Sequence, residues 1–533
     1  MLKQLMSSEL FFIFSTIVLL LHLISPVWTA KILLVAPFEA QSQCILITPY
    51  IEALAEHGHE LTVIHAYGHC GALENVRYIY INPRSNSYPD WIGENFSGVH
   101  NKWIEVTSIR TFMLKLCLHL MENDTVKDLL NSNSKFDLVI IDPSHMDCIY
   151  GLAAHFNATL MGISSCGSDW NLDTLIGYTS SSIYEPILPI GFRSADTFLD
   201  RLYNWFYLSE EWLLMHLLFL PKIRMVHNHF FGHLDQSFTE IRQSFSLMLL
   251  NQHFTIYPAR PNVPKMIEVA GMHLPKSTPS LPDDLADFID TAPHGVIYFA
   301  LGVEMQSKDL PEDTLQMLLN VFEALPQRVI WKFETQPPPK VSKNIYIDDW
   351  LPQMAILAHP NVKLFITNAG MLSIIETIYY AKPVIGLPLF YDQFRNLQRI
   401  LENDMGKMLN LNTMTSEEVK NSIHEMIQEP QYQRNALALS QRFRDQPMHP
   451  LDTAIYWTEY ILRHKGAPHM QVSLSNMKFI DYYCLDKLIL IAFRFSGIMG
   501  IMYFVLLKSK CLLKGLTKIY TGIWCTITHH FGR

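Results

Sequence analysis

Three polar segments in the second half of this 533-residue chain carry the residues best suited to binding chemistry. The apolar run Lys363–Thr367 leads into a turn of small residues, Asn368–Ser373, and then into the helix-like stretch Ile374–Glu376. A strand, a small-residue turn and a helix start bearing a Ser predict an anion site, because free backbone N–H groups and the helix dipole favour phosphate. The other two segments flank this turn.

Trp350–Gln353 precedes the turn by about 15 residues and offers an aromatic face and an amide, which suit a nucleotide base. Core packing is the alternative explanation for a lone Trp beside a Pro. Asp392 and Gln393 follow Pro388 and supply two polar side chains that can bind sugar hydroxyls.

The elements that must position these residues predict an α/β protein. Short apolar runs typical of buried parallel strands alternate with helical stretches in two blocks. The expected strands are 31–37, 60–65, 136–141 and 159–163 in the first block, and 296–301, 328–333, 363–367 and 383–387 in the second. Such alternation predicts two doubly wound domains facing a cleft, with ligands at the carboxyl ends of the strands.

Both ends of the chain indicate a membrane protein of the secretory route. The apolar run 10–24 predicts a cleaved signal peptide, with an uncleaved anchor as the alternative. The run 488–507 has the length of a membrane span, and four Lys residues follow it, so we expect a cytosolic tail and a lumenal main body. Three sequons, at Asn95, Asn123 and Asn157, agree with that topology. The Trp- and Leu-rich segment 201–225 predicts a helix that is either buried or resting on the bilayer.

Composition excludes other classes. A net charge of −9 without a basic stripe argues against a nucleic-acid partner, and 49% hydrophobic residues argue against disorder. No His or Cys cluster has the spacing of a metal site, so we expect no metal. The expected lumenal part contains five cysteines without framework spacing, and we expect them to be free and buried: Cys44, Cys70, Cys117, Cys148 and Cys166.

Nearly the whole chain resembles the UDP-glycosyltransferase family in its membrane-bound animal form, which includes UDP-glucuronosyltransferases and insect UDP-glucosyltransferases. The resemblance rests on the segments PHGVIYFALG, VIWKFE, WLPQMAILAHP, FITNAGMLSIIET and AKPVIGLPLFYDQFRNL. It implies the GT-B fold, with two Rossmann-like domains. Within that fold it implies that Trp350 stacks on uracil, Gln353 bonds the base and Glu376 takes the ribose hydroxyls. The implied contacts of the phosphates and the donor sugar are Gly302, Asn368, Gly370, Ser373, Asp392 and Gln393.

The resemblance also implies domain boundaries and a compartment. We expect a signal peptide (1–29), an acceptor-binding domain (30–257), a Pro-rich linker (258–283), a UDP-sugar-binding domain (284–470), a membrane span (488–507) and a cytosolic tail (508–533). The protein is then a type I protein of the endoplasmic reticulum membrane with a role in detoxification.

The chain departs from the family at its catalytic position. Family members use a His in the first βα loop as the base and an Asp after a later strand to hold it; here these positions are Gln43 and Asp142. An amide cannot act as a general base, and losing that step is worth roughly 10²–10⁴ in rate. His145, three residues beyond Asp142, is the candidate replacement base, and packing is the alternative explanation for it. Donor-side residues of the family are also replaced, at Ala300, Val303, Asn368 and Ala369.

Two hypotheses follow from this combination. The first is an enzyme that transfers a hexose, most simply glucose, from a UDP-sugar to small lipophilic hydroxyl acceptors with inversion, at reduced activity. The second is a catalytically impaired homologue that binds a nucleotide sugar or lipophile, or that regulates an active partner by oligomerisation. Neither needs a cofactor beyond the UDP-sugar co-substrate.

Overall fold

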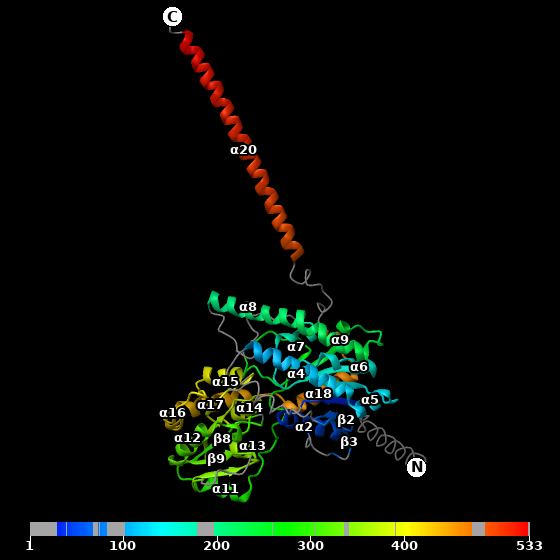
Figure 1. Cartoon of the computed structure of the whole chain (residues 1–533), viewed down its shortest axis with the longest axis vertical. Coiled ribbons are helices and arrows are strands. Elements are labelled where there is room, and N and C mark those ends of the chain that lie inside the picture. Colours follow the sequence, from blue (N-terminus) through cyan, green and yellow to red (C-terminus); the bar gives the residue numbers. More distant parts are fainter. Residues whose placement is uncertain are drawn as a thin grey trace, which may run out of the picture. The chain divides into compact units, whose positions relative to one another are not determined.

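The computed structural model describes residues 29–38, 40–67, 73, 75–82, 102–178, 197–257, 259–303, 305–334, 341–389, 391–471 and 485–530 (Figure 1). Residues 1–28 of the expected signal peptide and the sequon at Asn95 lie outside these ranges.

The first domain is built on a seven-stranded parallel sheet with the order β3-β2-β1-β4-β5-β6-β7. Its strands are β1 (Lys31–Ala36), β2 (Glu60–His65), β3 (Val76–Tyr80), β4 (Leu138–Ile141), β5 (Thr159–Ser164), β6 (Phe245–Leu250) and β7 (Met266–Glu268). Side chains alternate between the two faces of the sheet, so Leu33 and Val35 enter one core cluster while Ile32 and Leu34 enter another.

Helices cover both faces of this sheet, as its buried apolar strands require. Their bounds are α2 (Gln41–Glu56), α4 (Lys102–Glu122), α5 (Asp124–Asn131), η1 (Asp147–Ile149), α6 (Gly151–His155), α7 (Trp170–Leu175), α8 (Phe198–Leu214), η2 (Met215–Phe219), α9 (Leu220–Phe231) and α10 (Phe238–Arg242). Side chains of α2 share a cluster with Ile32, whereas those of α4, α6 and α9 share one with Leu33.

The second domain has a six-stranded parallel sheet with the order β10-β9-β8-β11-β12-β13. Its strands are β8 (Val296–Ala300), β9 (Arg328–Lys332), β10 (Ile345–Asp348), β11 (Val362–Thr367), β12 (Val384–Gly386) and β13 (Gly406–Met408). Its helices are α11 (Asp283–Asp290), η3 (Ser307–Asp309), α12 (Glu312–Glu323), α13 (Gln353–Ala358), α14 (Met371–Tyr379), α15 (Gln393–Glu402), α16 (Ser416–Gln428) and α17 (Pro430–Arg444). The predicted α/β architecture of two doubly wound sheets is confirmed.

Two segments differ from the expected organisation. The segment 258–283, expected as a linker, contributes β7 to the first sheet, where it pairs with β6. Helix α18 (Pro450–Arg463), expected in the second domain, packs on the first, since Ala454 and Ile455 join the Ile32 cluster and the Tyr50 and Thr458 hydroxyls are hydrogen-bonded at 2.6 Å. The chain returns to the first domain because that sheet face is apolar and α2 alone leaves part of it for α18 and η4 (Pro468–Met470) to cover.

The C-terminal segment is a separate unit and consists of helix α20 (Leu485–His530). Among the described residues, it is the helix long and apolar enough to cross a membrane, over Leu485–Trp524. The expected span 488–507 lies inside it, and the helix continues through the Lys residues that follow.

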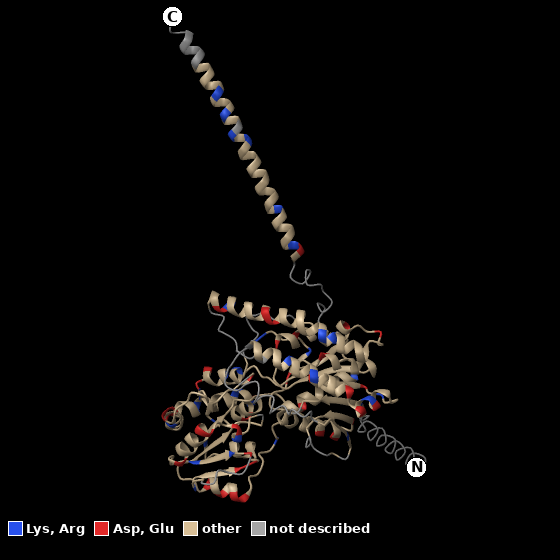
Figure 2. Cartoon of the chain, in the orientation of Figure 1, with Lys and Arg blue, Asp and Glu red and all other residues tan. Residues whose placement is uncertain are grey.

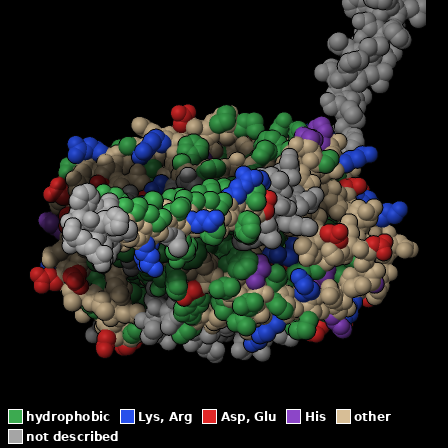
Figure 3. All heavy atoms as spheres, turned by 90° about the horizontal axis from the view of Figure 1, so that it is seen from above, with side chains coloured by type: hydrophobic (Ala, Val, Ile, Leu, Met, Phe, Trp, Pro, Cys, Tyr) green, Lys and Arg blue, Asp and Glu red, His purple; other side chains and the backbone are tan. Residues whose placement is uncertain are grey.

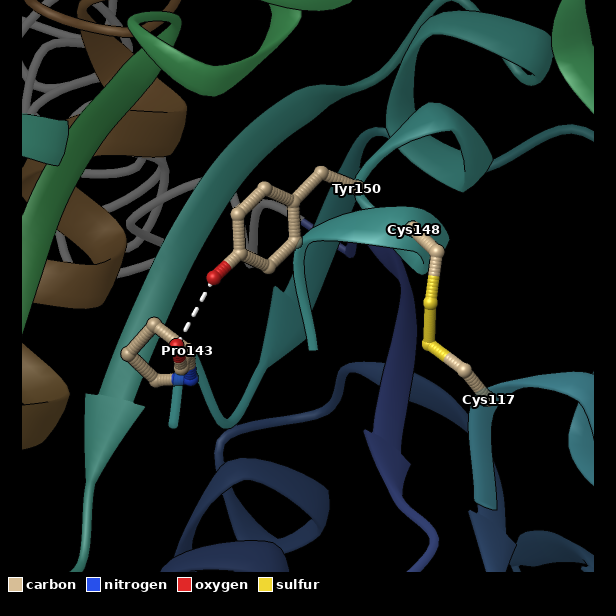
Figure 4. Close-up of a disulfide and its surroundings, with 4 residues drawn as sticks. All are labelled: Cys117, Pro143, Cys148 and Tyr150. Carbon is tan, nitrogen blue, oxygen red and sulfur yellow. Dashed lines mark hydrogen bonds between the residues drawn. A yellow bond between two sulfur atoms is a disulfide. The ribbon is translucent and has the colours of Figure 1, made fainter. Parts of the chain in front are cut away.

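The expectation of free cysteines is wrong for three of them. Cys117 at the end of α4 and Cys148 in η1 form a disulfide with a Cα–Cα distance of 6.5 Å (Figure 4), and Cys44 is also disulfide-bonded. Beside this disulfide, the Tyr150 hydroxyl donates to the Pro143 carbonyl at 2.7 Å (Figure 4). Cys166 is free, as expected, but half-buried, and Cys70 lies outside the described residues. The sequence concealed the disulfide because packing of α4 against η1, and not sequence spacing, brings its two thiols together.

Replacing both Cys117 and Cys148 by Ala should lower the free energy of unfolding by about 3–4 kcal/mol, the chain-entropy value for a loop of this length. Thermal unfolding of the detergent-solubilised chain measures this change. The matched control, Cys166→Ala, removes a half-buried thiol without opening a loop and should cost clearly less. Equal losses for the two variants would contradict a structural role for the disulfide.

Candidate functional site

A cavity of about 390 Å³ is lined by residues of both domains, and it collects the catalytic-position and donor-binding residues expected from the sequence. The first domain contributes Gln43, Asp142 and His145. The second contributes Gly302, Trp350, Gln353, Asn368, Gly370, Ser373, Glu376, Asp392 and Gln393. Most of these residues follow the carboxyl end of a parallel strand, which is the ligand-binding edge of such sheets.

Strand order explains why Gln43, Asp142 and Ser165 meet. They follow β1, β4 and β5, which are neighbours in the first sheet. The Gln43 Nε2 donates to Asp142 Oδ2 at 2.7 Å, Ser165 Oγ donates to the same oxygen at 3.2 Å, and the Ser144 N–H donates to Asp142 Oδ1 at 2.9 Å. Burial raises the pKa of Asp142, and these hydrogen bonds oppose that shift. Gln43 Oε1 is buried and has no hydrogen-bond partner within the described residues, so it is an acceptor left over at the cavity wall.

His145 lies on the same side of the cavity but is held by other groups. Arg110 Nη1 donates to His145 Nδ1 at 3.1 Å, and Arg110 Nη2 donates to Glu211 Oε1 at 3.0 Å. A guanidinium only donates, so Nδ1 is the accepting nitrogen and the ring proton sits on Nε2. Burial and the Arg110 charge hold the pKa of His145 well below its usual value.

A hydrogen-bonded network fixes the carboxylate of Glu376. Gln353 Nε2 donates to Glu376 Oε2 at 2.8 Å and lies 3.2 Å from Ser373 Oγ, while Tyr298 Oη donates to Gln353 Oε1 at 3.2 Å. On the other side, His273 Nε2 lies 3.3 Å from Glu376 Oε1. The expected base-binding and ribose-binding residues therefore form one unit before any ligand arrives.

The turn before α14 contains a hydrogen-bond donor that has no partner among the described residues. Asn368 Oδ1 accepts from the Gly370 N–H at 3.3 Å, whereas Asn368 Nδ2 is buried without a partner within the described residues. Ala369 has a φ of 63°, a left-handed conformation that favours Gly, and its side chain is fully buried. Gly302, at φ 87°, approaches the Asn368 amide so closely that a Cβ would lie 2.9 Å from Nδ2. The turn thus presents an amide N–H and the α14 N-terminus at the cavity.

Lys332, at the end of β9, is a cavity residue that the sequence analysis missed. Its Nζ donates to the Gly302 carbonyl at 3.1 Å, pairs with Glu334 at 2.8 Å and lies 5.7 Å from the centre of the Trp350 ring. Trp350 is 52% exposed and lines the cavity, so part of its ring is accessible to a ligand. The signals that could have found Lys332 are its place at a strand end and its position in the segment VIWKFE.

Asp392 and Gln393 lie where β12 leads into α15. Asp392 Oδ2 accepts from Asn396 Nδ2 at 2.8 Å, and burial raises the pKa of Asp392 while Arg395 opposes that shift. Gln393 Oε1 accepts from the Leu389 N–H at 2.8 Å. Arg395 Nη2 donates to the Cys166 carbonyl at 2.6 Å, a bond that joins the two domains beside the cavity.

Within the described residues, no group of three or more His, Cys, Asp or Glu side chains is placed to hold a metal ion. The donors on the second domain's side of the cavity are instead an amide, a hydroxyl, an ammonium and a helix N-terminus. This set suits an anionic ligand.

Comparison with known proteins identifies the family. The family model described as "UDP-glucoronosyl and UDP-glucosyl transferase" matches residues 30–522. The protein "UDP-glycosyltransferase UGT5" of Dactylopius coccus is 33% identical over 519 residues, which cover 95% of this chain and 97% of that protein. The 2-hydroxyacylsphingosine 1-beta-galactosyltransferase of Mus musculus is 29% identical, over 90% of this chain and 87% of its own.

Among solved structures, CalG4, the calicheamicin glycosyltransferase, matches with a TM-score of 0.55 at 14% identity, covering 82% of this chain and 99% of CalG4. This likeness shows the two-domain GT-B fold. Taken with the family match across almost the whole chain, it establishes that the protein belongs to the UDP-glycosyltransferase family.

Proposed function

We propose that this protein transfers glucose from UDP-glucose to small lipophilic acceptors with inversion at C1, and that it does so without a general base. The acceptor oxygen forms a bond to C1 while the bond from C1 to the UDP oxygen breaks. The observation that carries the proposal is the hydrogen bond from Gln43 to Asp142 at the wall of a cavity that also holds the donor-side residues.

On the donor side, Trp350 stacks on uracil and Glu376 accepts the ribose hydroxyls. Gln353 bonds the base, Ser373 and the Gly370 backbone meet the phosphates, and Asp392 and Gln393 hold the sugar. Support comes from the exposed part of the Trp350 ring and from the hydrogen bond that Gln353 donates to the Glu376 carboxylate. The α14 N-terminus and the Asn368 amide stabilise the departing UDP, so the proposed reaction needs no cation.

On the acceptor side, Gln43 binds the acceptor but does not remove its proton. Its Nε2 is bound to Asp142, which leaves the buried Oε1 to accept the O–H of an acceptor that binds in its neutral form. An amide oxygen is too weak a base to remove that proton near neutrality, so the acceptor must lose it to water before transfer. Phenols, carboxylates and thiols meet this condition, and aliphatic alcohols do not.

His145 is not the base in this proposal. The nitrogen that would accept a proton, Nδ1, is occupied by Arg110, and a protonated ring would face the Arg110 cation. The same observation favours a second candidate function, a homologue that binds UDP-sugar without turning it over. Measured turnover on acidic acceptors decides between the two.

We place the reaction in the lumen of the endoplasmic reticulum, with α20 as the span of a type I protein. The sequons support this placement. Asn157 is exposed, and Asn123 uses its Oδ1 to cap α5, which leaves its Nδ2 for a glycan.

UDP should raise the melting temperature of the detergent-solubilised chain, because a ligand present at about 100 times its Kd adds roughly 2.7 kcal/mol of stability. Trp350→Ala should abolish that rise through loss of uracil stacking. The control is Trp205→Ala, which removes a similarly exposed Trp outside the cavity and should keep the rise. Absence of any UDP effect on the wild-type chain at millimolar UDP contradicts the donor assignment.

His145 should make folding sensitive to acid. Its folded pKa lies well below the unfolded value of about 6.5, so the stability it contributes is present above that pH and is lost as pH falls below it. Asn tolerates the φ of 60° at this position and can accept from Arg110, so His145→Asn should lose less melting temperature than wild type between about pH 7.5 and about pH 5.5. The control is His424→Asn, at an exposed position, and it should lose as much melting temperature over this pH range as wild type. An unchanged loss in His145→Asn would refute the buried neutral ring.

Gln43→His should restore a base beside Asp142 and raise transfer to aliphatic alcohols by roughly 10²-fold or more, with a much smaller gain on phenols. Initial rates with UDP-glucose and a matched phenol and alcohol measure this ratio. His145→Ala should leave the relative rates on the two acceptors as they are in wild type. If the wild-type protein already transfers glucose to alcohols and His145→Ala abolishes that transfer, His145 is the base and the proposal fails.

A further inference from the structure

In the first domain, one long helix exposes large apolar side chains to the outside, where a surface helix normally exposes polar ones. In α8 and η2, large apolar side chains that are each more than two-fifths exposed recur at helical spacing: Phe198, Leu202, Trp205, Phe206, Leu213 and Leu217. We call these six residues the apolar face. Figure 3 shows a row of hydrophobic side chains running along this surface, with Lys and Arg atoms beside it, and Figure 2 shows long uncharged stretches of α8.

The opposite face of the same helix is buried and partly polar. Glu211 points inward to the buried ion pair with Arg110, Asn204 is fully buried, and Met215 and Phe219 enter the core. These inner contacts hold the helix in one rotation about its own axis. The apolar face therefore stays on the outside. A water-exposed surface helix normally shows the reverse pattern, and contiguous exposed apolar residues of this kind mark an interaction surface.

Two observations identify the partner as lipid. Helix α20, the candidate span, begins at Leu485, and covalent geometry limits the 13 residues 472–484 to a reach of at most roughly 50 Å, so the described domains stay near any bilayer that α20 enters. Exposed Lys222 and Arg224 follow the apolar face along the chain in α9, where they suit lipid phosphates, and Trp and Phe are typical of helices lying in an interface.

We propose that the apolar face lies in the headgroup and upper acyl region of a phospholipid bilayer, so that α8 is a second membrane contact in addition to α20. Arg110 ties α8 to α4, whose Ile109, Phe112 and Met113 line the cavity. Resting on the proposed function, this docking brings the acceptor side of the cavity within one helix of the membrane that dissolves lipophilic acceptors.

Lipid photolabelling of the full chain tests the docking. The chain is reconstituted in vesicles of phosphatidylcholine and phosphatidylserine that contain a phospholipid with an acyl-chain diazirine, and adducts are mapped by mass spectrometry. Adducts at 198–217 should exceed those at Leu437 on α17 at least several-fold. Leu437 is the matched control because it and Leu213 are both 47% exposed apolar residues on surface helices.

The paired variant Leu213→Glu/Leu217→Glu should lose most adducts at 198–217, while Leu437→Glu should keep them. Labels confined to α20 would overturn the proposal, and so would equal labelling at Leu437. Cross-links between copies of the apolar face in place of lipid adducts would identify a second chain as the occupant and also overturn it. Since no activity is measured, failure of the proposed transfer reaction leaves this result unaffected.

Discussion

The hydrogen bond between Gln43 and Asp142 is the constraint on which the site's chemistry depends. It exists because β1 and β4 are neighbours in a parallel sheet, so the residues that follow them share one edge. The Asp142 carboxylate is buried and accepts from Gln43, Ser165 and Ser144. A carboxylate in that position can orient an imidazole and stabilise its charge, but bound to an amide it can only fix the amide's rotation.

The donor side of the cavity retains its framework despite the substitutions around it. Glu376 accepts from Gln353 and lies 3.3 Å from His273 Nε2, and Trp350, which is half-exposed, lies 5.7 Å from Lys332 Nζ. Ala369 occupies a left-handed conformation, yet its methyl group is fully buried in a core cluster, so packing offsets some of the backbone strain. Under the proposed function, a cavity that keeps the expected nucleotide-binding residues and has an amide at the position of the family's base is suited to acceptors that supply their own negative charge.

Much of this site could be predicted because the parallel sheet converts sequence order into position. A strand-like run followed by a polar residue, as at Ile141–Asp142 or Thr367–Asn368, predicts a place at the cavity without any knowledge of contacts. Lys332 also ends a strand-like run and could have been predicted in this way, whereas His273 lies in a Pro-rich stretch that resembles a linker. Their roles depend on tertiary packing that brings them to Trp350 and Glu376.

Strands β6 and β10 were also not expected, although β6 is a continuous apolar run that a local pattern could have predicted. The other parts that the sequence did not predict are decided by long-range packing. The short strands β3, β7 and β13 carry weak patterns and form because a neighbouring strand offers an edge. Helix α18 crosses back to the first domain because apolar surface there must be covered, which no local pattern signals. The disulfide of Cys117 and Cys148 likewise follows from the packing of α4.

The most direct test of the central claim is the pH dependence of kcat/KM for a series of phenols with graded pKa values. If the acceptor supplies its own anion, the inflection of each profile should move with the pKa of the phenol used. An inflection that stays at one pH for every phenol would show that a group of the protein removes the proton, and it would contradict the account.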